Sequence, residues 1–303
     1  MRPYVVIATK GRAKECYTLI DYLADQSVLP QKTVFVGVED SDIAGLDEHP
    51  KLAKIGGRIL KSEKAGSSVQ RNIGIDLIIP DAGSDRDWFI AFFDDDFRPD
   101  RDWLASAATV LAENSNLAAI TGQVLADGVK GPGISESEAK KHISGELSPI
   151  PCWAQGNEMR ELESLYGCNM AVRGSVFESA RFDERLPLYA WQEDRDFSYY
   201  ARAFGTVAYH PAPRGVHLGT KSGRTSGLRL GYSQIANIVY LREKGSISAG
   251  VCFKFLSKSL LSNTLKSLRN NKFIDYRGRL KGNFLAIRDG LRGQMEPERI
   301  LSL

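Results

Sequence analysis

The chain predicts an α/β fold with a Rossmann-like, mostly parallel sheet flanked by helices, and three observations support this prediction. Short apolar strand patterns alternate with helix patterns through the first hundred residues. The strand pattern at 87–93 is apolar almost throughout, which is typical of a parallel strand buried on both faces. Polar clusters follow three of the strand patterns, and such folds bind ligands at the carboxyl ends of their strands.

The N-terminal elements follow from periodicity and turn residues. Three strands are expected before the buried one, over residues 4–8, 32–38 and, more weakly, 57–60. A helix is expected over 13–25 and stops near Pro30. A second helix, over 66–79, has apolar residues at every fourth position and stops at Pro80. The next helix should begin near Pro99, because proline suits a first helical turn.

The second half of the chain is less regular. Residues 127–165 predict loops, and 165–177 predict a strand followed by a helix. Residues 189–205 predict a loop that enters a helix with Gly205 as its C-cap, before a short strand at 206–211.

From residue 230 onward the pattern is helical, amphipathic and basic. We therefore expect one domain over 1–240, with a nucleotide-binding half (1–100) and an acceptor half (101–240). A basic helical extension should follow over 241–303.

Bulk composition is that of a globular protein, with 303 residues, 43% of them hydrophobic and 25% charged. The net charge of +3 does not indicate a nucleic-acid binder. The charge is uneven, because the last 62 residues hold 13 Lys and Arg against 5 Asp and Glu. We expect no secretory leader and no membrane-spanning helix. Four cysteines without metal-type spacing favour free thiols in a reducing compartment, so a cytoplasmic location is expected.

Three adjacent aspartates, Asp94, Asp95 and Asp96, end the apolar strand. Neighbouring carboxylates repel one another, and a divalent cation offsets this repulsion. In an extended chain Asp94 and Asp96 share one face, whereas Asp95 points away and should matter least. The triplet predicts a Mg²⁺ or Mn²⁺ site with Asp96 as the best ligand and Asp94 as a ligand or a ribose contact. For the motif alone, a polar turn with a helix cap is the alternative.

Motifs in the right order over residues 3–240 resemble the family-2 glycosyltransferases, which are inverting enzymes with a GT-A nucleotide-sugar-binding fold. The segments are "VVIATKGR", "VGVED", "GSSVQRNIGI", "FFDDDFRPDRDWL" and "GCNMAVRGSVFESARFDERLPLYAWQEDRDFSYYARAFG". The second departs from the usual form, which has a further aspartate and Gly-Ser-Thr. The resemblance implies metal-dependent transfer of a sugar from a nucleotide sugar, most simply a UDP-sugar. The acceptor would be a glycan or glycolipid hydroxyl in bacterial surface polysaccharide assembly.

The resemblance assigns donor-binding roles to several polar residues, namely Thr9, Lys10, Arg12, Glu39, Asp40, Arg71, Asn72, Asp94 and Asp95. Glu39 or Asp40 would hold the base, and the register between these two stays open. Lys10 and Arg12 could instead be solvated turn charges. Arg71 could equally form an ion pair in the core.

The acceptor side would lie at the start of the helix expected within 189–205. There Asp194 is the candidate general base, and Glu193 would support it or hold the acceptor. Trp191 suits the floor of a sugar site, and Cys168 and Asn169 would line the acceptor side. Ordinary charge at a helix start is the alternative for the acidic pair taken alone.

Two features follow the last strand of the body. The resemblance implies that His217 is a further metal ligand, although a lone histidine is more often structural. The Gly/Ser loop at 219–227 carries Lys221 and Arg224, and it could close over the donor's diphosphate. A plain connector is the alternative for this loop.

The tail contains apolar residues at spacings of three and four, interleaved with lysines: Phe253, Leu256, Leu260, Leu261, Leu265 and Leu268. A basic amphipathic helix of this kind predicts contact with an anionic membrane surface. Here that would be peripheral contact with the cytoplasmic face of the inner membrane. Docking on the body or on a second copy is the alternative, and the oligomeric state is left open.

Two other functions share parts of this pattern. A sugar-phosphate nucleotidyltransferase has the same sheet and metal aspartates, but it usually needs a Gly-rich loop after the first strand, where "TKGRAKE" has one glycine. A non-catalytic glycan-binding protein could keep the fold. The presence of two separate acidic pairs, at 94–96 and 193–194, favours an enzyme.

Overall fold

The structure is a computed structural model that describes residues 1–83, 86–269 and 271–303. In this part of the chain one sheet contains nine strands: β1 (Arg2–Ala8), β2 (Thr33–Gly37), β3 (Gly57–Lys61), β4 (Trp88–Asp94), β5 (Phe97–Pro99), β6 (Leu117–Asp127), β7 (Arg160–Glu161), β8 (Asn169–Arg173) and β9 (Thr206–His217). The helices that accompany them are α1 (Ala13–Ala24), α2 (Ser67–Ala82), α3 (Trp103–Glu113), α4 (Glu136–Ser144), α5 (Glu193–Ala201), α6 (Gly227–Lys244), α7 (Ala249–Ser267) and α8 (Tyr276–Leu291).

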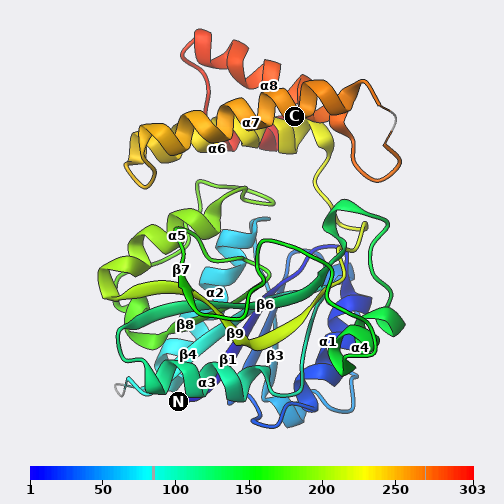
Figure 1. Cartoon of the computed structure of the whole chain (residues 1–303), viewed down its shortest axis with the longest axis vertical. Coiled ribbons are helices and arrows are strands. Elements are labelled where there is room, and N and C mark those ends of the chain that lie inside the picture. The colour runs from blue at the N-terminus through cyan, green and yellow to red at the C-terminus, as the bar shows by residue number, and fades with distance from the viewer. Residues whose placement is uncertain (84–85, 270) are drawn as a thin grey trace.

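The predicted α/β class with a mostly parallel sheet is confirmed (Figure 1). The strands lie in the order β3-β2-β1-β4-β8-β6-β9-β5, with β7 paired to β9. The four N-terminal strands pair in parallel, β8 is antiparallel to β4 and β6, and β6 pairs in parallel with β9. The carboxyl ends of β1, β2 and β4 therefore meet at one edge, and the three polar clusters meet there too.

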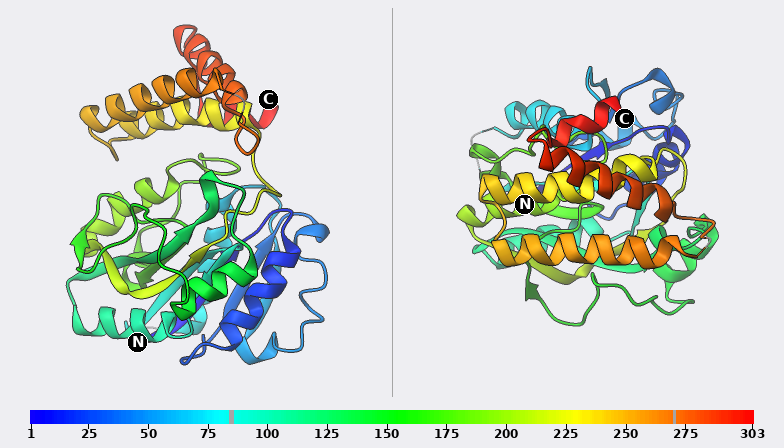
Figure 2. Two further views of the ribbon diagram at one scale, coloured as in Figure 1. Left: turned by 45° about the vertical axis from the view of Figure 1, so that its right-hand side comes forward. Right: turned by 90° about the horizontal axis from the view of Figure 1, so that it is seen from above.

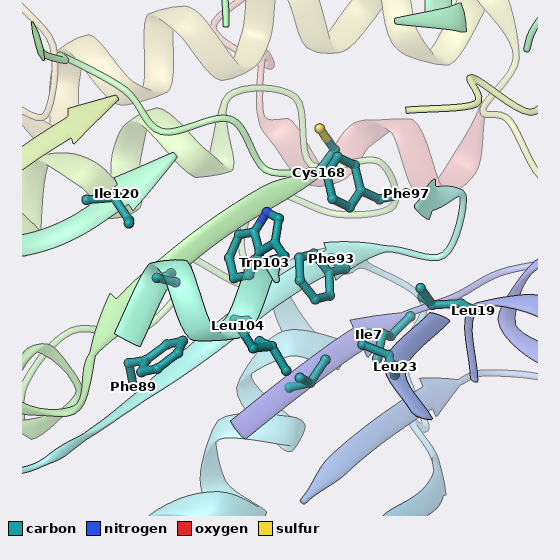
Figure 3. Close-up of a cluster of buried hydrophobic side chains, with 14 of the residues drawn as sticks. Ile7, Leu19, Leu23, Phe89, Phe93, Phe97, Trp103, Leu104, Ile120 and Cys168 are labelled. Atoms are coloured by element: carbon teal, nitrogen blue, oxygen red, sulfur yellow. The ribbon is translucent and has the colours of Figure 1, made fainter. Parts of the chain in front are cut away.

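Buried aromatic residues that flank the aspartate triplet in the sequence belong to one hydrophobic cluster (Figure 3). Phe93, the last apolar residue of β4, stacks on Phe97 with ring centroids 5.4 Å apart. Trp103 packs edge-on against Phe93 at 4.6 Å. Burying a large side chain contributes about 1.5–3 kcal/mol, so the two strands that flank the triplet are firmly anchored.

Several predicted boundaries differ from those of the structure. α2 continues past Pro80 to Ala82, because Ala82 is buried and the Gly83 N–H closes the last turn on the carbonyl of Ile79. Pro99 lies in β5, an edge strand where a missing N–H is tolerated, and α3 begins only at Trp103.

The predicted C-cap at Gly205 is confirmed, but for a short helical continuation. α5 ends at Ala201 and passes into the 3-10 helix η5 (Arg202–Phe204), and Gly205 is the C-cap of η5. β9 is also longer than the strand expected at 206–211, because its second half pairs with β5 and β6.

The region 127–165 is more ordered than predicted. It contains η3 (Gly128–Lys130), α4 and β7. α4 starts with a capping box in which Ser135 accepts from the Glu138 N–H and Glu138 accepts from the Ser135 N–H. The S-x-x-E signal for this helix was present in the sequence.

The C-terminal helices form a cap over the end of the body opposite the N-terminus (Figure 1). α6 packs Ile238 and Leu241 against Leu186 and Ala190 of the body. The boundary expected at residue 240 falls inside α6, whose last residue, Lys244, is ion-paired with the body. α6 is therefore a helix of the cap that fastens the cap to the body.

Candidate active site

The aspartate triplet forms the tight turn between β4 and β5. Asp95 is buried, and its carboxylate accepts from the Thr9 hydroxyl and from Arg12 Nη1, both at 2.8 Å. Asp96 is also buried, and its Oδ2 accepts from the Thr220 N–H at 2.7 Å. Asp94 stays partly exposed, with 34% of its side chain accessible. The turn thus ties β1 and the 219–226 loop together and leaves Asp94 open to a ligand.

Asp94, Asp96 and His217 come together as a possible metal site. Each offers one ligand atom, and these atoms all lie within 4.8 Å of one another. His217 Nε2 lies 3.3 Å from Asp96 Oδ1 and 3.9 Å from Asp94 Oδ2. Asp96 Oδ1 is buried and makes no hydrogen bond within the described residues. Two carboxylates and an imidazole suit Mn²⁺ or Mg²⁺, so these residues fit the predicted metal.

Asp127 and Tyr166, which the sequence did not single out, orient His217. Asp127 ends β6 in register with His217 of β9, and its Oδ1 lies 3.2 Å from His217 Nδ1. The Tyr166 hydroxyl donates to Asp127 Oδ2 at 2.7 Å. This arrangement turns Nε2 toward the aspartates, as in the carboxylate–histidine pairs that support metal ligands.

The charges of this cluster are mutually stabilising. Burial opposes every charge, but His217 and Arg12 hold the pKa of Asp96 well below its ordinary value. His217 and Tyr166 likewise lower the pKa of Asp127 to about 2 despite its burial. In return, Asp96 and Asp127 raise the pKa of His217 well above its ordinary value. A proton on His217 thus takes the place that a cation would fill.

Replacing Asp127 by Asn should weaken Mn²⁺ binding by about tenfold or more, because the imidazole loses the charged acceptor that orients it. Isothermal titration of the purified protein with MnCl₂ measures this affinity. Asp47→Asn, at an exposed aspartate away from the site, is the matched control. Equal affinity in all three proteins would show that Asp127 does not support the metal site.

Mn²⁺ affinity should rise with pH, by up to about tenfold per unit, and level off above the raised pKa of His217. Below that pKa, His217 is protonated and each bound ion must displace its proton. Titrations in buffers of different ionisation enthalpy count the protons released. A pH-independent affinity with no proton release would remove His217 from the ligand set.

Arg71 of α2 connects this cluster to the acidic pair. Its Nη1 donates to Glu193 Oε1 at 2.6 Å, and its Nη2 lies 3.3 Å from Asp94 Oδ1. Burial lowers the pKa of Arg71, but Glu193 and Asp94 raise it by more, so the guanidinium stays charged. Removing one partner of a buried pair typically costs about 3–5 kcal/mol. Arg71 therefore forms a buried ion pair, which was one of the two alternatives for it, and its partners Glu193 and Asp94 are themselves candidate site residues.

Glu193 and Asp194 open α5, where the helix dipole favours negative charge. Asp194 Oδ2 accepts from the Gly167 N–H at 3.2 Å, and its Oδ1 accepts from the Arg195 N–H at 2.8 Å. Burial raises the pKa of Asp194. Burial and the neighbouring Asp194 raise the pKa of Glu193 to about 8, although Arg71 opposes this. Among the described residues no ion pair involves Asp194, and its carboxylate keeps lone pairs for a proton.

The turn that leads into α5 is strained. Leu188, Ala190 and Gln192 all have positive φ, at 59°, 48° and 72°. Such conformations cost about 1–3 kcal/mol each and persist where surrounding contacts hold them. Here the Ser67 N–H donates to the Leu188 carbonyl, and Asn237 of α6 donates to the carbonyl of Trp191. The cap helix thus helps to position the acidic pair.

The loop that follows β9 lies folded against the triplet. Arg12 donates to the carbonyls of Thr220 at 3.0 Å and Ser222 at 2.8 Å. Lys221 donates to two carbonyls of η3, at 3.0 and 3.2 Å, and Arg224 donates to the carbonyl of Thr220 at 2.9 Å. Burial and Arg224 lower the pKa of Lys221 to about 8. Both loop cations therefore sit on neutral partners that an anion could replace.

Two glycines permit close approaches in the site. Gly223 has φ +67°, and a Cβ there would lie 2.1 Å from the carbonyl oxygen of Lys10. A Cβ on Gly167 would lie 3.3 Å from Arg71 Nη2 and 3.4 Å from Glu193 Oε1. A larger residue would displace the loop in the first case and crowd the ion pair in the second.

Glu39 and Asp40 are the two acids that we expected to hold the base of the nucleotide. Neither of them is buried, whereas a third acid, Asp42, is. Glu39 and Asp40 are both exposed, and Asp40 pairs with Lys61 at 2.7 Å. Asp42 is buried and accepts from the N–H groups of Gly11, at 2.6 Å, and of Glu39, at 2.9 Å. Asp42 thus ties the turn after β1 to the turn after β2, and it leaves Glu39 and Asp40 available to a ligand.

Several predicted contact residues serve the framework instead. The Asn72 amide exchanges hydrogen bonds with the backbone of Phe182 at 2.9 and 3.0 Å, which holds the segment before α5. Asn169 is fully buried and binds Gly122 and Trp103, and Cys168 is buried too. These placements correct the expectation that the side chains of Asn169 and Cys168 line the acceptor side, since neither is accessible.

Trp191 remains at the surface side of the acidic pair. Its ring is partly exposed and lies roughly parallel to the ring of Tyr189, with centroids 6.4 Å apart. Tyr189 itself is 55% exposed. Two aromatic rings beside two carboxylates give the entrance of α5 the composition of a sugar-binding surface.

Comparison with known proteins identifies the fold. No protein-family model matches the chain, and no curated protein matches it. Among solved structures, S. aureus TarS in complex with UDP-GlcNAc is 16% identical, with a TM-score of 0.58 over 99% of this chain and 83% of that chain. The mannosyltransferase PcManGT from Pyrobaculum calidifontis, in complex with GDP-Man and Mn²⁺, is 13% identical, with a TM-score of 0.54 over 96% and 86%. GalNAc-T7 with UDP, GalNAc and Mn²⁺ is 14% identical, with a TM-score of 0.53 over 95% and 57%. The chain therefore has a GT-A-like α/β fold with a C-terminal helical extension.

Proposed function

We propose that this protein is a metal-dependent, inverting glycosyltransferase that moves a sugar from a nucleotide sugar to a hydroxyl group. One observation carries the proposal: the buried guanidinium of Arg71 contacts both Asp94 of the possible metal site and Glu193 of the acidic pair. In this proposal, the donor-side and acceptor-side carboxylates lie on either side of one cation. The complexes of the similar structures with UDP-GlcNAc, UDP and GDP-Man support a nucleotide-sugar donor, and we propose a UDP-sugar.

Asp94, Asp96 and His217 would hold Mn²⁺ or Mg²⁺ against the donor's diphosphate. When bound, the ion supplies positive charge that stabilises the departing diphosphate. The nucleotide would lie along the turns after β1 and β2, where Lys10, Glu39 and Asp40 are exposed. Lys221 and Arg224 would exchange their carbonyl partners for phosphate oxygens, so that the 219–226 loop stays folded over the donor.

Asp194 would act as the general base. The acceptor oxygen attacks the anomeric carbon from the face opposite the diphosphate, the bond from that carbon to the phosphate oxygen breaks, and its electron pair leaves with the nucleoside diphosphate. The acceptor's hydroxyl proton passes to the Asp194 carboxylate. Glu193, held by Arg71, would accept a hydrogen bond from the acceptor sugar, and Trp191 would pack on the sugar's CH groups. The resulting linkage has the opposite anomeric configuration to the donor.

The acceptor we propose is a glycan or a lipid-linked glycan of bacterial surface polysaccharide assembly. The exposed aromatic pair at the entrance of α5 supports a sugar acceptor. Linkage and sugar identity depend on the loops around this entrance.

A panel of nucleotide sugars tests the proposal. With Mn²⁺ present, one of them should raise the melting temperature of the protein and be slowly hydrolysed to free nucleoside diphosphate. If nucleotide sugars change neither the melting temperature nor the nucleotide pool, the proposal fails. Release of pyrophosphate from a nucleoside triphosphate and a sugar phosphate would identify a nucleotidyltransferase instead.

A further inference from the structure

α7 carries two apolar stripes with different surroundings. One stripe, which includes Val251, Phe255 and Leu256, packs inward against α6 and the body. The other stripe faces away from the protein, with exposed fractions of 74%, 63%, 56% and 78% for Phe253, Leu261, Leu265 and Leu268. Successive spacings of eight, four and three residues place these four side chains on one face of the helix and its C-terminal continuation. We call them the outer ridge.

The surroundings of the outer ridge carry charge of one sign. Residues 245–274 contain five Lys and Arg and no Asp or Glu. Lys254 and Lys258 are exposed beside Phe253 and Leu261, and the other three cations, which are exposed too, follow near Leu265 and Leu268. The apolar ridge is therefore bordered by cations along its whole length.

The position of α7 leaves this ridge exposed among the described residues. Figure 2 shows α7 running beside α6 at the outer edge of the cap. Single exposed apolar residues are normal on a protein surface, but four large ones grouped on one helix face indicate a binding surface. If the ridge bound the ridge of a second copy of the chain, the five cations of each copy would face one another, and their repulsion would oppose the pairing. In the described part of the chain, no helix is long and apolar enough to cross a bilayer.

We propose that the outer ridge binds an anionic lipid surface, with α7 lying in the plane of the membrane. Phe253, Leu261, Leu265 and Leu268 enter the boundary between headgroups and acyl chains, and Lys254 and Lys258 lie against lipid phosphates. The inner stripe meanwhile fastens α7 to the cap. Docking on the body, one of the two alternatives left open by the sequence, is shown for the inner stripe. The other alternative, contact with a membrane, is what we propose for the outer ridge. This inference does not depend on the proposed transferase activity.

Vesicle sedimentation of the full chain tests the proposal. The protein should bind vesicles of phosphatidylcholine with phosphatidylglycerol more tightly than vesicles of phosphatidylcholine alone, and salt should weaken binding. Lys254→Gln/Lys258→Gln should reduce binding to the anionic vesicles by roughly fivefold for each lysine removed. Lys14→Gln/Lys140→Gln, at two exposed lysines of the body, is the matched control.

The apolar contribution is tested by a second pair of variants. Leu261→Gln/Leu265→Gln should lose binding to both kinds of vesicle, whereas Leu147→Gln/Ile150→Gln, at exposed residues of the body, should bind like the unmodified chain. Thermal melts confirm that each variant folds. Vesicle binding that survives both ridge variants overturns the proposal. A second result would also overturn it. If the unmodified chain does not bind vesicles and light scattering shows a dimer, and if Leu261→Gln/Leu265→Gln converts that dimer to a monomer, then the ridge binds a second copy of the chain.

Discussion

Replacing Asp194 by Asn should lower the rate of sugar transfer by about 10²- to 10⁴-fold while leaving donor affinity nearly unchanged. The amide has the same shape as the carboxylate but cannot take the acceptor's proton. In the described part of the chain, Asp194 accepts from the N–H groups of Gly167 and Arg195, and no hydrogen bond or ion pair joins it to Arg71 or to the metal cluster. Donor binding should therefore survive its loss of charge.

The measurement pairs a transfer assay with isothermal titration of donor in the presence of Mn²⁺. Glu163→Gln is the control. Glu163 is an exposed acid outside α5, and it pairs with Arg195, the residue that follows Asp194 in α5. The Asn side chain must turn one N–H toward a backbone N–H, so a stability loss of about 1–3 kcal/mol is expected and is checked by thermal melts. If Asp194→Asn loses both donor affinity and transfer activity, Asp194 lies on the donor side and is not the general base.

Replacing Asp96 by Asn should abolish measurable Mn²⁺ binding and lower turnover by about 10³-fold, which corresponds to roughly 4 kcal/mol of transition-state stabilisation. Asp96 has the one triplet carboxylate that is both buried and in contact with His217, and its Oδ1 makes no hydrogen bond within the described residues. Asn keeps the oxygen that accepts from Thr220, so the 219–226 loop should stay in place.

The neighbouring aspartate provides the control. Asp95→Asn should reduce stability, because Arg12 and Thr9 lose their charged partner, but Mn²⁺ affinity should remain within a few-fold of the original. Mn²⁺ binding is followed by electron paramagnetic resonance, which does not depend on activity. If Asp95→Asn removes the metal and Asp96→Asn does not, the assignment of the two residues is reversed.

Local patterns were sufficient for much of this fold. Strand β4 was recognisable because its residues are apolar on both faces, and α1 because its apolar residues recur with helical period. The triplet was recognisable because adjacent carboxylates at the end of a buried strand need a cation. His217 was singled out through the family resemblance, and the structure places it at the end of β9, with Nε2 3.3 Å from Asp96 Oδ1.

Other parts depend on partners that are distant in the sequence. Asp127 meets His217 because β6 pairs with β9 in parallel, with register shifts between Thr121 and Gln123 and between Val124 and Ala126. Nothing in the neighbourhood of Asp127 along the chain indicates this pairing. In the same way Asn169 looked available to an acceptor, yet its amide is used inside the core by Trp103 and Gly122.

The sequence by itself determined the α/β class, the parallel N-terminal strands and the edge of the sheet where the acidic residues gather. These features depend on periodicity and on residue types at strand ends, which are local properties. Only the tertiary structure decided which of those residues face one another. It placed Arg71 between Asp94 and Glu193, Asp127 behind His217, and one apolar stripe of α7 inward and the other outward. The physical reason is that ion pairs, hydrogen bonds and burial require partners from separate elements, and the register of the packed elements selects those partners.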